Sequence, residues 1–316
     1  MQEQIKHFKS LRSVRERSNK VYEKAKTNTL NHFRVDFSKL QDVVTKVIAL
    51  TKRDYKQTSD IPPHGRWILI NEWKSNCDEL EITRRLLDLF VISVLLDAGA
   101  GNAWSYKEQE TGYIYNRSEG LAIASLDMFK SGMFSTLDSQ PHQVDGTCLQ
   151  QINSLLREVH ENYLTYFWLT HIIADRLEKI RVEDVRLAFQ VNENNPLEGL
   201  EGRANLLSRL GHALKVQSKY FKSNNNSVNY LLSNSIINET GTFIELDTLW
   251  SVIVYGFSEI WPPTRTSLEG VSLRDVWPCE VLKSPNTSLN STDHLVSFHK
   301  LSQWLTYSLI EPMIKI

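Results

Sequence analysis

The residues best suited to chemistry flank a glycine-rich linker. Asp97 ends an apolar run, and the linker that follows it closes with Arg117, Ser118 and Glu119. A carboxylate at the carboxyl end of a helix faces the negative pole of the helix dipole, so Asp97 needs a partner or keeps its proton. Either Arg117 neutralises Asp97 and pins the linker, which is the interpretation we favour, or the pKa of Asp97 rises and the residue serves in proton transfer.

A second group of chemically capable side chains lies near the carboxyl end of the chain. Residues 296–311 predict a helix with a buried stripe of leucines at 301, 305 and 309. At about 100° per residue, the other side of this helix carries His299, Lys300, Gln303, Trp304 and Tyr307. Such a face can line a polar pocket, where an aromatic ring stacks on a flat group and His or Lys meets an anion. A solvent-exposed face with two aromatic rings packed on a neighbour is an equal alternative.

The hydrophobic pattern predicts the helices that position the first group. Residues 86–96 are apolar on nearly every side, which predicts a helix that is buried all round and too short to span a bilayer. Gly99 and Gly101 follow it and can take the positive φ that ends a helix. A second helix is predicted to start with Ser118 as its N-cap and Glu119 at its positive end.

The rest of the chain also favours helices. Apolar residues recur at helical spacing within 4–57, where one helix opens at Asp36, and again within 147–178 and 246–260. No repeat of 20–50 residues is present and alternating strand patterns do not dominate. We therefore predict an all-α, multi-helix globular fold with a few short strands at most, as a single helical domain over residues 1–316.

One arginine stands where a helix usually avoids positive charge. Residues 203–216 predict a helix, and Arg203 at its start opposes the dipole, so its side chain is expected to reach an anion or a carboxylate. Polar stretches near 222–229 and 283–293 predict flexible loops.

Composition excludes several classes of protein. The net charge of −1 provides no basic field for nucleic acid, and 41% hydrophobic residues suffice for a large core. Three distant cysteines without metal-ligand spacing indicate reduced thiols and no metal site. Because the amino end lacks an apolar signal segment, we expect a cytoplasmic protein, with the nucleus as an additional location. We expect no cofactor, no nucleic-acid partner and no membrane partner.

Several stretches together resemble one family. They are SVLLDAGAG from Ser93, RSEGLAIASLDMFKSGMFS from Arg117, FQVNENNPLEGLEGRANLLSRLG from Phe189, IWP from Ile260 and LVSFHKLSQWLTYSLIEP from Leu295. They resemble the uracil-catabolism (URC pathway) protein family of fungi and bacteria, long catalogued as a domain of unknown function. The resemblance runs from SVRERSNKVYEKA near the amino end through Pro312. Relative to this family, we expect the chain to lack a carboxyl-terminal segment.

The resemblance implies a pathway and a reaction. The family belongs to a route in which uracil is converted to its nucleotide, the ring is opened and a ribosylurea-type compound leads to urea. It is also distantly similar to queuosine-nucleotide glycosylases, helical proteins that hydrolyse an N-glycosidic bond. The implied step is hydrolysis of the bond between ribose, expected as its 5′-phosphate, and urea or a ureido fragment. The implied partner is a small nucleotide-derived substrate, with contacts to a pathway enzyme as a further expectation.

The matching motifs imply roles for individual residues. The catalytic candidates are Asp97, Glu119 and His299. The substrate-binding candidates are Trp104, Tyr106, Arg117, Ser118, Arg203, Lys300, Gln303, Trp304 and Tyr307. Two alternatives stay open. One is a non-catalytic or inactive truncated member that binds the intermediate or a pathway enzyme. The other, an amidohydrolase acting on the ureido carbonyl, is disfavoured because it needs a metal or an activated nucleophile.

Overall fold

Contacts along the chain define two compact units. The computed structural model describes residues 2–61, 79–134, 174–221, 235–239, 241–262, 264–283 and 291–314. Unit 1 comprises Met1–His64 and Pro262–Lys300, and unit 2 comprises Gly65–Trp261 and Leu301–Ile316. Each unit therefore combines segments that are distant in the sequence. The single domain predicted for residues 1–316 stays a prediction.

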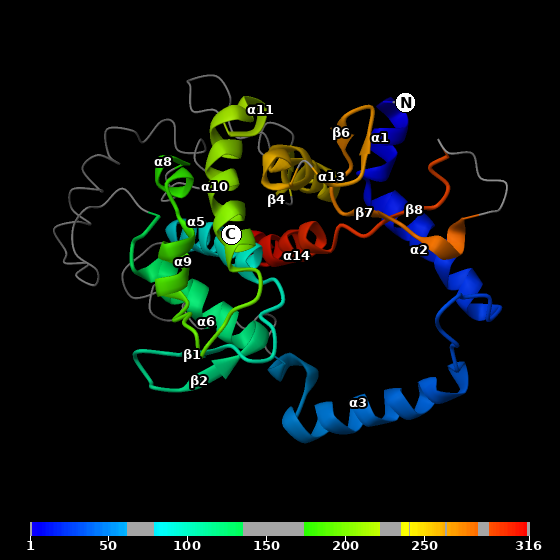
Figure 1. Cartoon of the computed structure of the whole chain (residues 1–316), viewed down its shortest axis with the longest axis horizontal. Helices are drawn as coiled ribbons and strands as arrows, with labels where there is room; N and C mark the ends of the chain where they lie inside the picture. Colours follow the sequence, from blue (N-terminus) through cyan, green and yellow to red (C-terminus); the bar gives the residue numbers. More distant parts are fainter. Residues whose placement is uncertain are drawn as a thin grey trace. The chain divides into compact units, whose positions relative to one another are not determined.

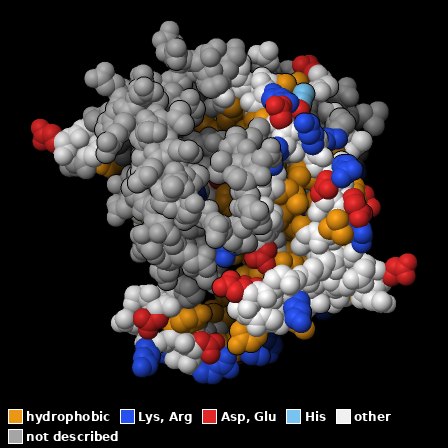
Figure 2. Space-filling model, turned by 90° about the vertical axis from the view of Figure 1, so that its left-hand side faces the viewer, with side chains coloured by type: hydrophobic (Ala, Val, Ile, Leu, Met, Phe, Trp, Pro, Cys, Tyr) orange, Lys and Arg blue, Asp and Glu red, His pale blue; other side chains and the backbone are white. Residues whose placement is uncertain are grey.

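The fold class is mainly α, as predicted. The described strands are short and pair two by two, β1 with β2, β3 with β4, β5 with β6 and β7 with β8 (Figure 1). Figure 2 shows acidic and basic side chains interspersed over the described part of one face, in keeping with the net charge of −1. Within the described ranges, no helix combines the length and the apolar character needed to cross a membrane.

Unit 2 contains most of the described helices. They are α5 (Glu79–Leu96), α6 (Arg117–Lys130), α8 (Ala174–Glu178), α9 (Val182–Ala188), α10 (Leu200–Val216), α11 (Ser218–Phe221), α13 (Leu246–Ser251) and, from Leu301 onward, α14 (Lys300–Ile314). Its strands are β1 (Ser105–Lys107), β2 (Ile114–Asn116), β3 (Ile236–Asn238) and β4 (Gly241–Phe243). The hairpin of β1 and β2 lies in the sequence between α5 and α6 and pairs Tyr106 with Tyr115.

Helix α5 forms the centre of unit 2. Every residue from Leu86 to Leu96 is buried, which confirms the predicted helix. Ser93 faces Ser125 of α6, with 2.5 Å between their hydroxyl oxygens, so the two helices pack directly. The helix ends before a linker in which Gly101 takes φ +79°, as predicted, whereas Gly99 does not have a positive φ.

Two helix boundaries differ from those predicted. Helix α6 begins at Arg117 with Asn116 as its N-cap, so Ser118 lies inside the first turn and the N-cap assignment was wrong. Strand β2 runs to Asn116, which leaves no room for a later cap. The apolar segment 246–260 is α-helical only to Ser251 and continues as a π-helical turn, Val252–Gly256, and a 3₁₀ turn, Ser258–Ile260. Of the helix predicted over 147–178, only 174–178 lie within the described residues.

Unit 1 combines the first 64 residues of the chain with the later segment 262–300. Its helices are α1 (Gln2–Phe8), α2 (Leu11–Lys26) and α3 (Leu40–Asp54), with 3₁₀ turns at Phe37–Lys39, Thr58–Asp60 and Glu280–Leu282. Its strands are β5 (Ser267–Leu268), β6 (Val271–Ser272), β7 (Val276–Pro278) and β8 (Leu295–Ser297). The buried apolar residues Phe8, Leu273, Val276 and Leu295 form its core.

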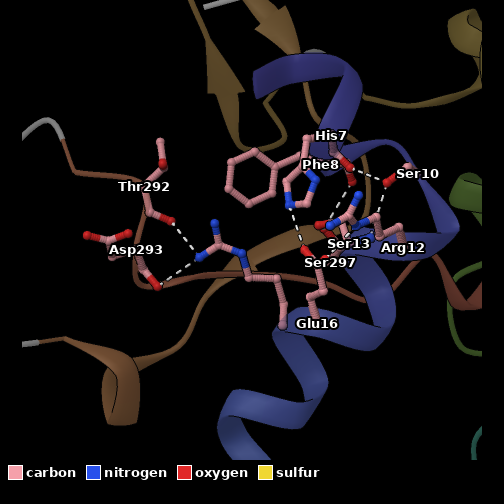
Figure 3. A network of polar contacts seen from close by, with 10 residues as sticks. His7, Phe8, Ser10, Arg12, Ser13, Glu16, Thr292, Asp293 and Ser297 are labelled. Atoms are coloured by element: carbon pink, nitrogen blue, oxygen red, sulfur yellow. Dashed lines mark hydrogen bonds and ion pairs between the residues drawn. The ribbon is translucent and has the colours of Figure 1, made fainter. Parts of the chain in front are cut away.

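Polar contacts hold α2 against β8 in unit 1 (Figure 3). The hydroxyl oxygens of Ser13 and Ser297 lie 2.8 Å apart, and Ser297 donates to the backbone oxygen of Phe8 at 2.9 Å. Arg17 donates to the backbone oxygen of Asp293 at 3.2 Å. The described end of the predicted 283–293 loop is therefore attached to α2. The predicted 222–229 loop lies outside the described residues.

Candidate functional site

The α5–α6 corner, residues 97–102 and 116–119, is the candidate site in unit 2. It joins the carboxyl end of α5 to the amino end of α6, with the β1–β2 hairpin between them (Figure 1). Asp97 is half-buried, whereas Arg117, Ser118 and Glu119 are exposed. Three of the four candidate residues in this corner are thus exposed to solvent.

Arg203, on α10, holds the backbone of the corner through hydrogen bonds. The side chain is 1% exposed, and its Nε donates to the backbone oxygen of Leu96 at 3.0 Å. One terminal nitrogen donates to the oxygens of Ala98, at 2.6 Å, and Gly99, and the other to the oxygen of Glu198. A guanidinium at the last carbonyls of a helix satisfies them and complements the negative pole of the dipole.

The contacts of Arg203 correct two expectations. The arginine reaches neither outward nor across to a carboxylate hydrogen bond, because its donors are directed at backbone oxygens of the corner and of residue 198. Arg203 is also the cation whose pKa Asp97 affects. Burial lowers the pKa of Arg203, and the negative charge of Asp97 partly offsets this by favouring the charged guanidinium. A substrate-binding role for Arg203 stays a prediction that its burial argues against.

Arg117 has a different partner from the one expected. Its Nη2 donates to Oδ1 of Asn102 at 3.1 Å. The Arg117–Asp97 ion pair was therefore the wrong prediction, because Arg203 from α10 occupies the end of α5. The backbone of Arg117 has φ +52°, a left-handed conformation that costs about 1–2 kcal/mol in a residue with a Cβ atom. Strain of this kind often accompanies functional sites.

Two of the aromatic binding candidates, Trp104 and Tyr106, are core residues. Trp104 is 1% exposed, its indole N–H donates to the backbone oxygen of Phe189 at 2.9 Å, and its ring stacks on that of Phe189. A Cβ atom at Gly120 would approach the Trp104 ring to 2.9 Å, so the first turn of α6 rests directly on the indole. Tyr106 is also buried. Trp104 therefore packs under the first turn of α6, and the binding roles of Trp104 and Tyr106 stay predictions that their burial argues against.

The hydroxyl of Tyr106 donates to Oδ2 of Asp127, on α6, at 2.8 Å. Burial, and then this hydrogen bond, raise the pKa of Tyr106. Burial also raises the pKa of Asp127, and the hydrogen bond from Tyr106 partly offsets this. The pair joins β1 to α6, and sequence analysis missed Asp127 because a single aspartate on a helix carries no distinctive spacing.

Two side-chain amides complete the free edge of β1. Asn195 accepts from the N–H of Ser105 at 2.8 Å and donates to its oxygen at 2.9 Å. Gln190 does the same for Lys107, at 3.1 and 2.8 Å. Ser105 and Lys107 present their backbone groups on one edge, so the two amides replace a third strand. Sequence analysis missed this role of Asn195 and Gln190.

His299 and Lys300 belong to unit 1 and not to the corner. His299 is fully buried at φ +46°, and its Nε2 lies 2.8 Å from the backbone oxygen of Phe8. Burial lowers the pKa of His299 below its ordinary value. The residue precedes α14, so its predicted place on the polar face of that helix was wrong. Lys300 is exposed, and its backbone N–H donates to Asp275 at 2.9 Å.

Helix α14 has the two faces that the sequence predicted. Leu305 and Leu309 are buried in the core of unit 2, and Leu301 packs against it. On the other side, Trp304 is 44% exposed and Tyr307 68% exposed, while Gln303 is half-buried. The binding roles of these three side chains stay predictions.

One part of the predicted set lies in the α5–α6 corner, where Arg117 contacts Asn102. Asp97, Arg117, Ser118 and Glu119 share the α5–α6 corner, with Asn102 as an addition that the sequence did not reveal. Within the described residues, no group of three or more His, Cys, Asp or Glu side chains is arranged to hold a metal ion.

Known proteins resemble this chain over nearly its whole length. "Uracil catabolism protein 4" of Lachancea kluyveri is 35% identical over 98% of this chain and 69% of its own length. "Protein urg3" of Schizosaccharomyces pombe (strain 972 / ATCC 24843) is 36% identical over 98% of this chain and 69% of its own length. No solved structure matches. The family described as "Protein of unknown function (DUF1688)" matches residues 7–161 and 169–316, so the chain belongs to this family.

Proposed function

We propose that the chain acts in uracil catabolism and hydrolyses the N-glycosidic bond of a phosphorylated, ribosylurea-type intermediate. The name of the Lachancea kluyveri relative supports the pathway. The accessible residues of the α5–α6 corner support the reaction, because they combine carboxylates, an arginine and the first turn of a helix.

The proposed reaction needs only water as a co-reactant. The bond between C1 of ribose and the urea nitrogen breaks, and both of its electrons stay with the nitrogen. The oxygen of water bonds to C1, one proton of that water passes to a carboxylate, and a carboxylic acid gives a proton to the leaving nitrogen. The products are ribose 5-phosphate and urea.

The exposed first turn of α6 carries this proposal. Glu119 and Asp97 supply the two carboxyl groups that glycosidic hydrolysis requires. Arg117 and the backbone N–H groups at the start of α6 suit a phosphate, because helix N-termini carry partial positive charge. Asn116 makes no side-chain hydrogen bond as N-cap, so its side chain does not cover these N–H groups.

The test is urea release from synthetic ribosylurea 5′-phosphate by the purified chain. We expect Glu119→Gln or Asp97→Asn to lower kcat by about 10²–10⁴, the usual contribution of one proton-transfer group. Arg117→Ala should mainly raise KM, and this effect should disappear with unphosphorylated ribosylurea. Asn205→Ala, an exposed change on α10, serves as the matched control.

Two results would overturn the proposal. Binding of the phosphorylated compound without urea release would assign the chain to the non-catalytic alternative. Turnover that is unchanged in both carboxylate variants would remove the corner from the reaction.

A further inference from the structure

Helix α3 of unit 1 exposes an apolar face that a stable helix normally covers. Its exposed aliphatic side chains are Leu40 at 59%, Val43 at 57%, Val44, Val47 at 56%, Ile48 and Leu50. At about 100° per residue they lie on one side of the helix, with Ala49 on the opposite side. Contiguous apolar surface of this kind marks an interaction site.

The folding of α3 itself is well specified. Asp36 caps the preceding 3₁₀ turn, because its Oδ1 accepts from the N–H of Ser38 at 3.0 Å. Phe37 stands edge to face with Tyr22 at the end of α2, which attaches the start of α3 to unit 1. The start of α3 is therefore held against α2.

The charges beside the apolar face indicate the chemistry of the partner. Lys39, Lys46 and Arg53 are seven residues apart and border the face on one flank. Lys39 lies 4.0 Å from Asp42 and Arg53 2.7 Å from Asp54, and both of these pairs are exposed to solvent, so their charges are only weakly compensated. In the heptad pattern set by Leu40 and Val47, these three residues hold the position from which charged residues reach a partner helix. A basic flank at every heptad favours an acidic flank on the partner.

The same flank disfavours two copies of α3 against each other. In an antiparallel pair the basic flanks would face one another, and like charges at a helix interface are repulsive. In a parallel pair each basic flank would meet Val44 and Thr51, which offer no charge. The helix itself carries no aromatic side chain of the kind that anchors helices in a lipid interface.

We propose that the apolar face of α3 docks an amphipathic helix of a partner protein whose flank is acidic at heptad spacing. The aliphatic side chains supply the buried contact. Lys39, Lys46 and Arg53 select the partner and its register.

The test uses two synthetic 28-residue probes that differ only in charge. Both carry Ile and Leu at the a and d positions of four heptads, one with Glu and the other with Lys at e and g. Binding to the full chain is measured by fluorescence anisotropy at low and high salt. We expect the acidic probe to bind at least about tenfold more tightly than the basic probe, with the difference shrinking in high salt.

Variants of the chain test whether the contact is with α3. Val47→Glu should weaken binding of the acidic probe by at least about tenfold, because it places a charge in the apolar face. Ala49→Glu adds the same charge to the same helix on its opposite side and should change binding little. Reversing Lys39, Lys46 and Arg53 to Glu should transfer the preference to the basic probe.

Four outcomes would overturn the proposal. Equal binding of both probes removes the charge selection, and no binding means that the face is already covered in solution. A dimer of the chain that Val47→Glu dissociates assigns the face to a second copy. Binding to vesicles rich in phosphatidylserine, lost in Val47→Glu, together with no binding of either peptide, assigns the face to a membrane surface.

Discussion

Nε of Arg203 donates to the backbone oxygen of Leu96, the last residue of α5, at 3.0 Å. Leu96 is separated from Arg203 by more than a hundred residues, yet this contact and the neighbouring ones to Ala98, Gly99 and Glu198 fix the path of the chain into the α5–α6 corner. The buried Arg203 thus holds the backbone of the corner, while the side chains of Arg117, Ser118 and Glu119 stay exposed to solvent.

Loss of the Arg203 contacts should destabilise unit 2. Arg203→Ala removes the donor to the buried backbone oxygen of Leu96 and the part-buried hydrogen bonds to Ala98, Gly99 and Glu198, so we expect the free energy of unfolding to fall by about 2–4 kcal/mol in urea denaturation. Arg203→Lys should recover only part of this, because an ammonium lacks the planar fork. Asn205→Ala, exposed on the same helix, should change stability by less than about 0.5 kcal/mol.

Removal of the side-chain amides should loosen β1 locally. In Asn195→Ala we expect faster hydrogen exchange at the backbone N–H of Ser105, and in Gln190→Ala faster exchange at that of Lys107. Each change removes the side-chain oxygen that accepts from that backbone N–H. Each change should cost about 1 kcal/mol. Exchange that accelerates equally at both positions in either variant would contradict two independent clamps.

Asp127 should make stability fall with rising pH. Burial raises the pKa of Asp127, so between the ordinary aspartate pKa and the higher folded value the folded chain holds a proton that the unfolded chain has lost. Stability from this group is therefore lost as pH rises through that window. In urea denaturation, the stability of Asp127→Asn relative to the unchanged chain should increase from acid to neutral pH.

Asp184 provides a control of opposite sign. Hydrogen bonds from Arg181 lower the pKa of Asp184, so its stabilising contribution is present above the ordinary aspartate pKa and is lost as pH falls. Asp184→Asn should therefore be less stable than the unchanged chain at neutral pH and converge with it in acid. The same pH trend in both variants would refute the assigned shifts.

Lys9 should give a pH dependence in the alkaline range. Burial, and then the charge of Arg274, lower the pKa of Lys9 to about 8. Between about pH 8 and the ordinary lysine pKa the unfolded chain holds a proton that the folded chain has lost, so stability rises with pH. We expect Lys9→Met to be more stable than the unchanged chain near pH 7 and to lose this advantage near pH 10. The exposed Lys20→Met should show no such convergence.

The strain at Arg117 should separate stability from binding. Arg117→Gly removes the guanidinium and relieves φ +52°, so we expect about 1 kcal/mol of added stability together with weaker binding of ribosylurea 5′-phosphate. Arg117→Ala should weaken binding equally without the gain in stability. Thermal unfolding and substrate titration of both variants give the comparison, and equal stabilities would show that the left-handed backbone carries no strain.

The sequence by itself determined the local elements. Residues 86–96 lack a polar face, so they form a helix only where every side is buried, and Gly101 permits the turn that follows. The helical spacing of the leucines likewise predicted the two faces of α14. These features depend on neighbours within a few residues, which a pattern records.

Only the tertiary structure decided which distant groups meet. Arg203 reaches Leu96, Tyr106 reaches Asp127 and His299 is buried against Phe8. Each contact joins residues whose separation is set by the packing of whole helices, and the same side chain could have satisfied its hydrogen bonds elsewhere. Sequence therefore located the carboxylates and cations of the corner, whereas packing decided that Arg203 supports the corner and that Arg117 pairs with Asn102.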